Sequence, residues 1–375
     1  MDQKHLTGTD TVNYGSYYTP EWLVDIVYSL ILNHIPYFSN YHILDTSCGY
    51  GGFLRGNSAI GADIDRTAIR KAQTQLPNTH FFEQNSLLNI SRDQYNLAKK
   101  DKIIVVGNPP YNDTTSIIRN NIKQTNFERD KDVFSRDLGI SFLLSYDKIK
   151  ADYVCVLHPL SYLIKKTNFE SLRSFKNNYK LIDSVIVSSG VFSDTSKTTH
   201  FPIIIAFYER NIFGMDYNYI TNYKFKTNDN KLFSIHQYDT IGHYIEKYPN
   251  QKNVRENETV AYFYTMRDIN ALKRAATFLE KETYNAIRVT KSKLPYYCYV
   301  DVFKEYIPHI PYYFGNSDVM INNQAFNEIQ NYFISKTLKK RPVLAKYVEQ
   351  QKNYSDIEKP IQRYFKELLG EHYVD

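Results

Sequence analysis

An aliphatic run at residues 103–106 ends at the sequence GNPPY, residues 107–111, whose groups are able to activate an amine. The side-chain oxygen of Asn108 and the carbonyl of Pro109 are two acceptors, and the prolines, Pro109 and Pro110, hold them rigid without competing donors. Such a pair suits a planar NH2 group, because accepting both protons frees the nitrogen lone pair to attack. Tyr111 adds a flat face that can stack on the ring bearing the amine. The corner predicts chemistry at a planar amine; the alternative is an ordinary proline turn.

A glycine-rich segment, DTSCGYGGF at residues 45–53, follows a short apolar run that ends at Asp45. A second apolar run ends in Asp63, 18 residues after Asp45. Ligands of open parallel sheets bind at the carboxyl ends of strands, where an acid can accept the ribose hydroxyls. The segment lacks GxGxxG and an obvious cradle for pyrophosphate, which favours a nucleoside without phosphates, most often S-adenosylmethionine. The alternative is a glycine-rich turn that binds nothing.

A third strand-like run, at residues 80–82, is followed by the polar sequence Gln84-Asn85-Ser86. In a doubly wound sheet the end of this strand lies beside the same pocket. The side-chain amide of Asn85 could read an adenine edge there, or it could be a solvated loop residue.

Strand-like and helical patterns alternate through the first part of the chain. The strand-like runs are residues 41–44, 59–62, 80–82, 102–106, 153–157, 181–187 and 201–208, and the helical patterns are residues 19–35, 65–75, 137–149 and 169–177. This alternation predicts an α/β domain with a parallel sheet. Beyond residue 210 the rhythm fades, and helical patterns return only at 267–281 and 325–350. We therefore expect two domains, 1–212 and 213–375.

The composition is that of a mildly basic, globular protein with a net charge of +6 among 375 residues. The balance permits a nucleic-acid partner without establishing one. Cys48, Cys155 and Cys298 are far apart and form no CxxC pair, which predicts neither disulfides nor a metal site. No apolar stretch is long enough for a membrane span, and the N-terminus lacks the apolar core of a signal peptide. We expect a cytoplasmic location without membrane contact.

Taken in order, these motifs resemble those of the amino-methyltransferases that make N6-methyladenine in DNA, in the subclass whose cofactor motifs precede the catalytic motif. The resemblance covers residues 14–210 and begins with YGSYYTPEWLVDIV, which is similar to the family's N-terminal TP motif. It implies a seven-stranded, mostly parallel Rossmann-like methyltransferase sheet, a C-terminal α+β target-recognition domain, and S-adenosylmethionine as cofactor.

The resemblance also carries cofactor contacts onto residues of this chain. The glycine-rich segment resembles the family's acid-x-x-Cys-Gly-x-Gly-x-Phe loop, with Thr46 where proline is common, and GADID resembles its ribose motif. QNSLL resembles the adenine-reading motif, with Asn85 where Asp is usual. The implied cofactor-binding residues are Tyr18, Thr19, Pro20, Asp45, Ser47, Cys48, Gly49, Gly51, Phe53, Asp63, Ile64, Asn85, Ser86 and Asn108.

NPPY resembles the catalytic motif of the same family, which makes Asn108, Pro109, Pro110 and Tyr111 the implied catalytic residues. GVFSDTSKTTHFPIIIAFY resembles the motif that supplies a second aromatic against the target base, and we assign Phe192 to this role, with Phe201 as the weaker candidate. A duplex base must leave the stack to reach such a pocket, so the resemblance implies base flipping. We interpret residues 112–135 as a loop over the substrate or as a surface loop without function.

The NPPY corner also occurs in enzymes that methylate ribosomal RNA adenines or a glutamine of release factors. The N-terminal TP motif and the long C-terminal region favour double-stranded DNA as the partner. In that region Lys336, Lys339, Lys340 and Arg341 are candidate phosphate contacts, or simply solvated charges.

A fused nuclease is disfavoured, because the chain has no Glu-x-Lys and the Asp-x-Lys motif at residues 229–231 lies in a polar stretch without a strand-like frame. We therefore expect the protective methylase of a type II restriction–modification system, monomeric or dimeric. The cognate restriction endonuclease would be encoded separately, and the methylase would associate with the bacterial nucleoid through DNA.

Overall fold

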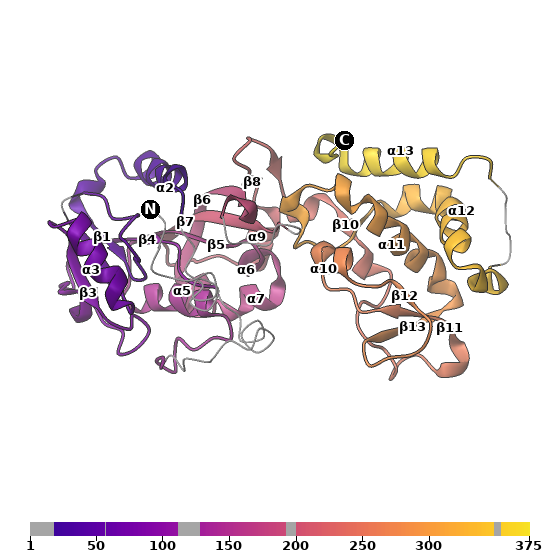
Figure 1. The fold of residues 1–375 in the computed structure, drawn as a ribbon, viewed down its shortest axis with the longest axis horizontal. Helices are drawn as coiled ribbons and strands as arrows, with labels where there is room; N and C mark the ends of the chain where they lie inside the picture. Colours follow the sequence, from indigo (N-terminus) through magenta and orange to yellow (C-terminus); the bar gives the residue numbers. More distant parts are fainter. Residues whose placement is uncertain (1–18, 57, 112–127, 193–199, 349–353) are drawn as a thin grey trace. The chain divides into compact units, whose positions relative to one another are not determined.

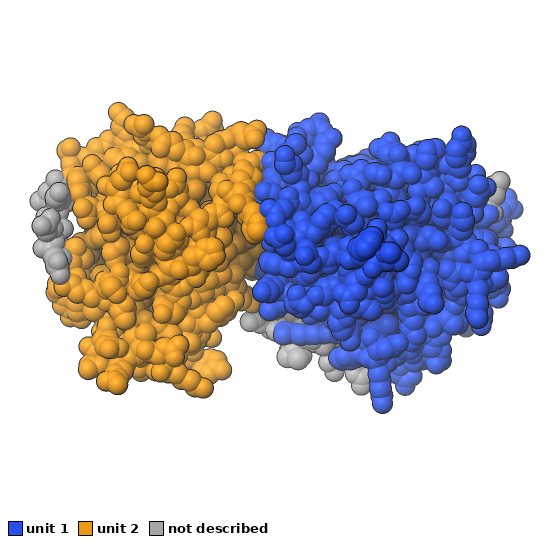
Figure 2. Space-filling view, turned by 180° about the vertical axis from the view of Figure 1, so that it is seen from behind, with its two compact units in different colours: residues 1–234 blue, residues 235–375 orange. Residues whose placement is uncertain are grey.

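The computed structural model describes residues 19–56, 58–111, 128–192, 200–348 and 354–375. Two compact units divide the chain, Met1–Ser234 and Ile235–Asp375 (Figure 2). The division falls 22 residues (234 − 212) after the boundary expected from the sequence. It does so because residues 213–234 pack on the first unit: the Tyr219 hydroxyl donates to the Leu181 carbonyl at 2.6 Å, and Asn228 N–H donates to the Ile186 carbonyl at 3.0 Å.

The first unit is built around a seven-stranded sheet with the strand order β3-β2-β1-β4-β5-β7-β6 (Figure 1). All its strand pairs are parallel except those made by β7, which runs antiparallel to both β5 and β6. The predicted fold class, a mostly parallel Rossmann-like sheet, is confirmed. The strands are β1 (His42–Asp45), β2 (Ala59–Asp63), β3 (His80–Glu83), β4 (Ile103–Gly107), β5 (Tyr153–Pro159), β6 (Tyr179–Ser188) and β7 (Pro202–Arg210).

The central strands are apolar on both faces because helices cover both sides of the sheet. In Figure 1, α2 (Glu21–His34) lies on one side of the sheet, and α5 (Leu138–Lys148), α6 (Ser161–Ile164) and α7 (Lys166–Ser171) lie on the other. Alternate strand residues form one core with α2, including Ile104 and Val106 of β4 and Ile203 and Ile205 of β7. This packing fixes the carboxyl ends of β1, β2 and β4 at one edge of the sheet.

Asx caps begin two of the helices that border that edge. Asp65 accepts from Thr67 N–H at 2.8 Å and begins α3 (Arg66–Gln75), and Asp137 accepts from Gly139 N–H at 3.0 Å and begins α5. These caps satisfy N–H groups that the first helical turn leaves unpaired. Both helices start within one residue of the sequence prediction.

The predicted helix over residues 169–177 is wrong in one respect, because the structure contains two short helices there, α7 and α8 (Ser174–Asn178). The break lies at Arg173, whose φ is +44°, a conformation that helices do not contain. Its guanidinium donates to the Phe134 carbonyl at 2.8 Å, which holds the chain in this bend. In the described part of the chain, no helix has the length and apolar character to cross a membrane.

The residues from 213 to 234 complete the first unit. They form α9 (Tyr217–Asn222) and a small hairpin of β8 (Phe225–Lys226) and β9 (Leu232–Phe233). A parallel bridge between Thr227 and Ile186 attaches the hairpin to β6.

The second unit is α+β, as predicted, with an aromatic core. Tyr299 of α11 has ring contacts with Phe303, Phe326, Phe333, Tyr364 and Phe365. Its strands are β10 (Asp239–Thr240), β11 (Thr259–Tyr264), β12 (Phe278–Leu279), β13 (Ala286–Thr290) and β14 (Met320–Ile321), and its helices are α10 (Ile269–Arg274), α11 (Leu294–Tyr306), α12 (Asn323–Lys340) and α13 (Glu358–Leu369).

The helical predictions for this unit are only partly right. The pattern at 267–281 is helical only over α10, after which the chain forms β12, and the pattern at 325–350 is helical only as far as Lys340 before a 3-10 segment. The sequence patterns did not identify α11 or α13. Aromatic residues such as those of LPYYCYV are compatible with both helix and strand, so periodicity alone does not distinguish the two.

Candidate active site

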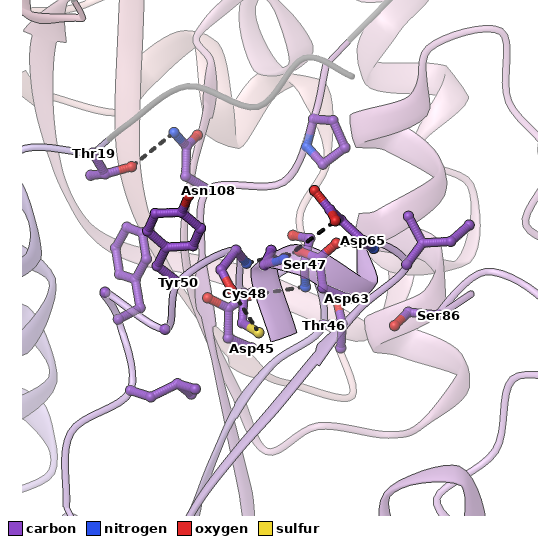
Figure 3. Close-up of a pocket in the computed structure, with 18 of the residues that line it drawn as sticks. Thr19, Asp45, Thr46, Ser47, Cys48, Tyr50, Asp63, Asp65, Ser86 and Asn108 are labelled. Atoms are coloured by element: carbon purple, nitrogen blue, oxygen red, sulfur yellow. Dashed lines mark hydrogen bonds between the residues drawn. The ribbon is translucent and has the colours of Figure 1, made fainter. Parts of the chain in front are cut away.

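A cavity of about 480 Å³ lies where the carboxyl ends of β1, β2, β3 and β4 meet. Its size is in the range of small-molecule sites in proteins. The cavity brings together residues from motifs that are far apart in the sequence. Of the predicted site residues, its lining includes Thr19, Asp45, Ser47, Cys48, Gly49, Gly51, Phe53, Asp63, Ile64, Asn85, Ser86, Asn108 and Pro110 (Figure 3).

The acids at the ends of β1 and β2 organise the glycine-rich loop. Asp45 accepts from Ser47 N–H at 3.0 Å, and Asp63 accepts from Gly49 N–H at 2.8 Å and from Asp65 N–H at 2.9 Å. Gly51 has a φ of +81°, a backbone conformation that strains any residue with a side chain, and a Cβ there would also displace the Leu76 side chain, whose Cδ1 would lie 2.9 Å away. The loop is thus bent back against β2 and leaves space at the strand ends.

Buried carboxyl groups dominate the electrostatics of the cavity. Burial raises the pKa of Asp45 to about 8, partly offset by the Ser47 N–H and reinforced by the charge of Asp63. Burial likewise raises the pKa of Asp63.

The lining of the cavity holds more carboxyl groups than cations. The carboxyl groups are Glu21, Asp45, Asp63 and Asp65, against the guanidinium of Arg55, which pairs with Asp25 at 2.8 Å. A nearby cation would stabilise the charged form of each carboxyl group, whereas a phosphate would destabilise it further. The lining therefore favours a cationic ligand over a nucleotide phosphate.

A buried hydroxyl also indicates a ligand. Ser47 Oγ is inaccessible to solvent and makes no hydrogen bond with the described residues. Buried polar atoms in native proteins are nearly always paired, and an exception inside a cavity suggests that a ligand group supplies the partner.

The other end of the cavity has an apolar wall that suits a flat ring. It is formed by Ile64, Leu87, Leu138 and Phe142, and the Ile64 side chain is 47% exposed toward the open space. Phe142 was not assigned to the site by the sequence patterns. Its position on the buried face of α5 is set by helix packing, so only its spacing from Leu138, one helical turn earlier, hints at a shared face.

Asn85, the predicted adenine reader, already uses both ends of its amide. Its oxygen accepts from Leu87 N–H at 3.0 Å, and its NH2 donates to the Glu128 carbonyl at 2.8 Å. The amide therefore joins the end of β3 to Glu128, which precedes α5 in the chain. The oxygen keeps a second lone pair for a ligand donor.

The corner formed by residues 107–111 begins at the last residue of β4. Gly107 has a φ of +141°, and a Cβ at this position would lie 2.7 Å from Asp45 Oδ1. A glycine is thus required for the strand to end against the buried acid. The next residue, Asn108, is half-buried and lines the cavity, Pro109 is buried, and Pro110 borders the opening.

Both ends of the Asn108 amide have hydrogen-bond partners. The NH2 donates to Thr19 Oγ1 at 3.1 Å, a contact drawn in Figure 3. The Tyr111 hydroxyl donates to Asn108 Oδ1. The sequence assigned Thr19 only to the cofactor, and no local pattern could have revealed its contact with a residue 89 positions away.

Two other residues that were predicted to bind the cofactor have roles in the fold. Pro20 is the N-cap of α2. Burial raises the pKa of the Cys48 thiol well above its usual range, so this cysteine is an inert core group.

Phe192 is 4% exposed and belongs to the hydrophobic core, and Phe201 packs against that core. As placed, the Phe192 ring offers no open face to a base, whereas Phe201 is half-buried. This placement corrects the expectation that Phe192 stacks on the target.

Two of the predicted features fall partly or wholly outside the described residues. Tyr18 lies outside them, and so do residues 112–127 of the predicted loop over the substrate. The described end of that loop is attached to the sheet edge. Asp130 accepts from Asn89 N–H at 2.8 Å and Ile90 N–H at 3.0 Å, and it pairs with Lys148 at 2.8 Å.

Most of the candidate phosphate contacts in the second unit face acids of the same unit. Lys336 is buried and pairs with Glu305 at 3.1 Å and with Glu358. Lys340 also pairs with Glu305.

The remaining two candidate phosphate contacts, Arg341 and Lys339, differ in their surroundings. Arg341 donates to Thr277 Oγ1 at 3.2 Å and lies 3.8 Å from the buried Asp301. Lys339 is exposed. The structure thus corrects the expectation for Lys336, whose ammonium is enclosed, whereas Lys339 and Lys340 are exposed.

No protein-family model matches the sequence, and no curated protein matches it. The chain is similar to a solved structure assigned as the modification subunit of a type I restriction enzyme from Vibrio vulnificus YJ016, at 17% identity and a TM-score of 0.40, covering 59% of this chain and 51% of that one. It is also similar to a type I restriction–modification methyltransferase subunit from Streptococcus thermophilus, at 12% identity and a TM-score of 0.39, with coverages of 60% and 48%.

A third similar structure is assigned as a class I S-adenosylmethionine-dependent methyltransferase from Listeria monocytogenes, with 16% identity, a TM-score of 0.40 and coverages of 60% and 68%. The chain spans about half the length of the two type I subunits. At these identities the likeness concerns the fold alone, and that fold is the seven-stranded, mostly parallel Rossmann-like sheet described above.

Proposed function

We propose that the chain is an S-adenosylmethionine-dependent methyltransferase that adds a methyl group to N6 of adenine within a specific sequence of duplex DNA. The observation that carries this proposal is the juxtaposition of Asn108 with an acid-lined cavity. An amide that can receive an amine stands at one end of a space that suits a cationic nucleoside. A phosphate-bearing cofactor fits this lining poorly, because carboxyl groups outnumber cations there and a phosphate would oppose their ionisation.

The residues of the cavity fit S-adenosylmethionine group by group. Asp63 would accept from the ribose hydroxyls, and Ile64, Leu138 and Phe142 would enclose the adenine. Ser47 and Asp45 would face the amino-acid part, where a hydroxyl without a partner and an acid without a cation stand among the described residues. The bound cofactor would supply an electrophilic methyl group.

The chain's own contribution is to orient and activate the target amine. Asn108 Oδ1 and the Pro109 carbonyl would accept its two protons, which frees the nitrogen lone pair, and the Tyr111 ring would stack on the base. Alignment and hydrogen bonds made as charge develops then lower the barrier without a strong base. Because the cofactor supplies the electrophile and the chain only orients the amine, no catalytic histidine or cysteine is needed at the corner.

Duplex DNA is proposed as the substrate because a second compact unit follows the catalytic one. Ile235–Asp375 has its own core and is available for recognising a sequence. The target adenine would have to leave the base stack to reach the corner. We further infer the protective role of a type II restriction–modification methylase, with a separately encoded endonuclease as its partner.

The test is methyl transfer from tritium-labelled cofactor to duplex DNA, RNA and release-factor protein, offered separately. We expect label in duplex DNA, recovered as N6-methyladenine after digestion to nucleosides. Label confined to RNA or protein would overturn the choice of substrate. Single-base methylation mapping of DNA from cells that express the chain would then give the recognised sequence.

A further inference from the structure

The amide of Asn108 is held at both ends by side chains of the same unit. Thr19 Oγ1 accepts from its NH2 at 3.1 Å, and the Tyr111 hydroxyl donates to its oxygen. Thr19 is 89 residues away along the chain, directly before α2. Figure 3 shows Thr19 and Asn108 facing each other at the edge of the cavity.

The direction of this amide matters because its two ends have opposite hydrogen-bonding character. The oxygen accepts, whereas the NH2 only donates. If the amide were turned by 180°, its NH2 would meet the NH2 of the target base, and two donors would face each other. A neutral amide carries no charge that would select the productive orientation, so a neighbouring group has to do so.

We propose that Thr19 is a positioning residue for Asn108, an inference that rests on the proposed methylation of an amine. Its hydroxyl oxygen holds the NH2 of the amide and directs Oδ1 toward the substrate. The Tyr111 hydroxyl occupies Oδ1 until the target amine replaces it, and the Thr19 contact persists throughout. Thr19 thus acts through Asn108 rather than on the reacting atoms.

The surroundings of Thr19 make it suitable for this role. It is half-buried and immediately precedes Pro20, whose carbonyl accepts from Leu23 N–H at 3.0 Å. Leu23, Val24 and Val27 of α2 are fully or almost fully buried in the core of the sheet. The hydroxyl is therefore carried by a rigid helix start, and proline limits the backbone on its C-terminal side.

The experiment compares Thr19→Val, which removes the hydroxyl at nearly constant shape, with Thr19→Ser, which keeps it. Turnover on duplex DNA and the dissociation constant of the cofactor, measured by calorimetry, are read for both variants. We expect Thr19→Val to lower kcat roughly 10- to 100-fold, the usual cost of removing a group that orients a functional ligand. The cofactor affinity should change less than about twofold, and Thr19→Ser should retain turnover within about threefold.

Ser47→Ala is the matched control, because it removes another hydroxyl from the same cavity. It should act mainly by weakening cofactor binding, because Ser47 lines the cavity and does not contact Asn108 in this structure. A Thr19→Val enzyme with the same pattern would show that Thr19 is only a cofactor contact and would overturn the inference. Normal turnover in Thr19→Val, or equal losses in the Val and Ser variants, would also overturn it.

Failure of the underlying function has a different signature. If the wild-type chain transfers no methyl group to adenine, the proposed function is wrong, and the inference about Thr19 is wrong as well. If the wild type methylates adenine and the Thr19 variants behave alike, the function stands and only the positioning role is lost.

Discussion

The corner at Asn108 in the first unit and the basic segment 336–341 in the second are both rich in groups that could bind a ligand, but they face different partners. Asn108 lines a cavity of about 480 Å³. Lys336 and Lys340, in contrast, point at Glu305 of their own unit. Residue type suggested a ligand in both places, and the fold provides an open site in only one of them.

The buried acids of the two units show the same difference. Asp45 is 1% exposed and has no cation beside it among the described residues, so burial raises its pKa to about 8. Asp301 is 6% exposed, but it accepts from the Thr277 hydroxyl at 2.5 Å and lies 3.8 Å from Arg341. An acid with internal partners supports the fold, whereas an acid left without a cation in a cavity is available to a ligand.

The largest expected effect comes from removing the acceptor at the corner. Asn108→Ala should lower kcat by roughly 10²- to 10³-fold, the usual cost of deleting one preorganised hydrogen-bonding group from a reacting centre. Cofactor affinity should stay within a factor of about two, since in the proposed mechanism the amide binds the target amine and not the cofactor. Stopped-time tritium transfer and calorimetry measure the two quantities, and loss of cofactor binding would move the active site elsewhere.

The next effect tests whether the corner depends on its contact with the buried acid. Gly107→Ala places a Cβ 2.7 Å from Asp45 Oδ1 at a φ of +141°. We expect the free energy of unfolding to fall by about 1–3 kcal/mol. Turnover should fall by up to roughly 100-fold as Asn108 is displaced. Gly52→Ala is the control, because a Cβ there meets nothing within 4 Å, and urea unfolding should distinguish the two variants.

A third prediction concerns Asp45, a buried acid without a cation beside it among the described residues, and the way it makes the free energy of unfolding depend on pH. The pKa of Asp45 is raised from 3.8 to about 8, so between these values the folded state holds a proton that the unfolded chain has released. The free energy of unfolding contributed by this group therefore falls as pH rises, by up to about 1.4 kcal/mol per pH unit. Asp45→Asn should flatten the urea-unfolding profile between pH 4 and pH 8; an unchanged slope would argue against a protonated Asp45.

The smallest effect compares two lysines of the basic segment. Lys336→Met should lower the free energy of unfolding by about 1–2 kcal/mol, because the buried ammonium forms ion pairs with Glu305 and Glu358. The loss stays this small because both glutamates are partly exposed and solvent screens their charges. Lys339→Met, at an exposed position, should change it by less than about 0.5 kcal/mol. If Lys339 contacts a phosphate, its loss should reduce the salt slope of DNA binding by about 1. Equal destabilisation by both substitutions would contradict the ion pairs as placed.

The sequence alone was sufficient to predict the sheet and the edge at which the site forms. Strand residues alternate between two faces, and the strands buried on both faces are continuously apolar, so β1, β2 and β4 could be located to within one or two residues. Parallel strands end at a common edge, which brings Asp45, Asp63 and Asn108 together without further information. The cavity confirms that these three residues line one space.

Only the tertiary structure decided which of the suggested groups are accessible and what they contact. Phe192 proved to be a core residue, and Lys336 an internal ion pair, because packing rather than residue type determines which way a side chain points. The partnership of Thr19 with Asn108 joins positions 89 residues apart, a distance over which no local periodicity acts. Local pattern specifies the ends of the strands, but the direction of each side chain at those ends depends on helices that pack from elsewhere in the chain.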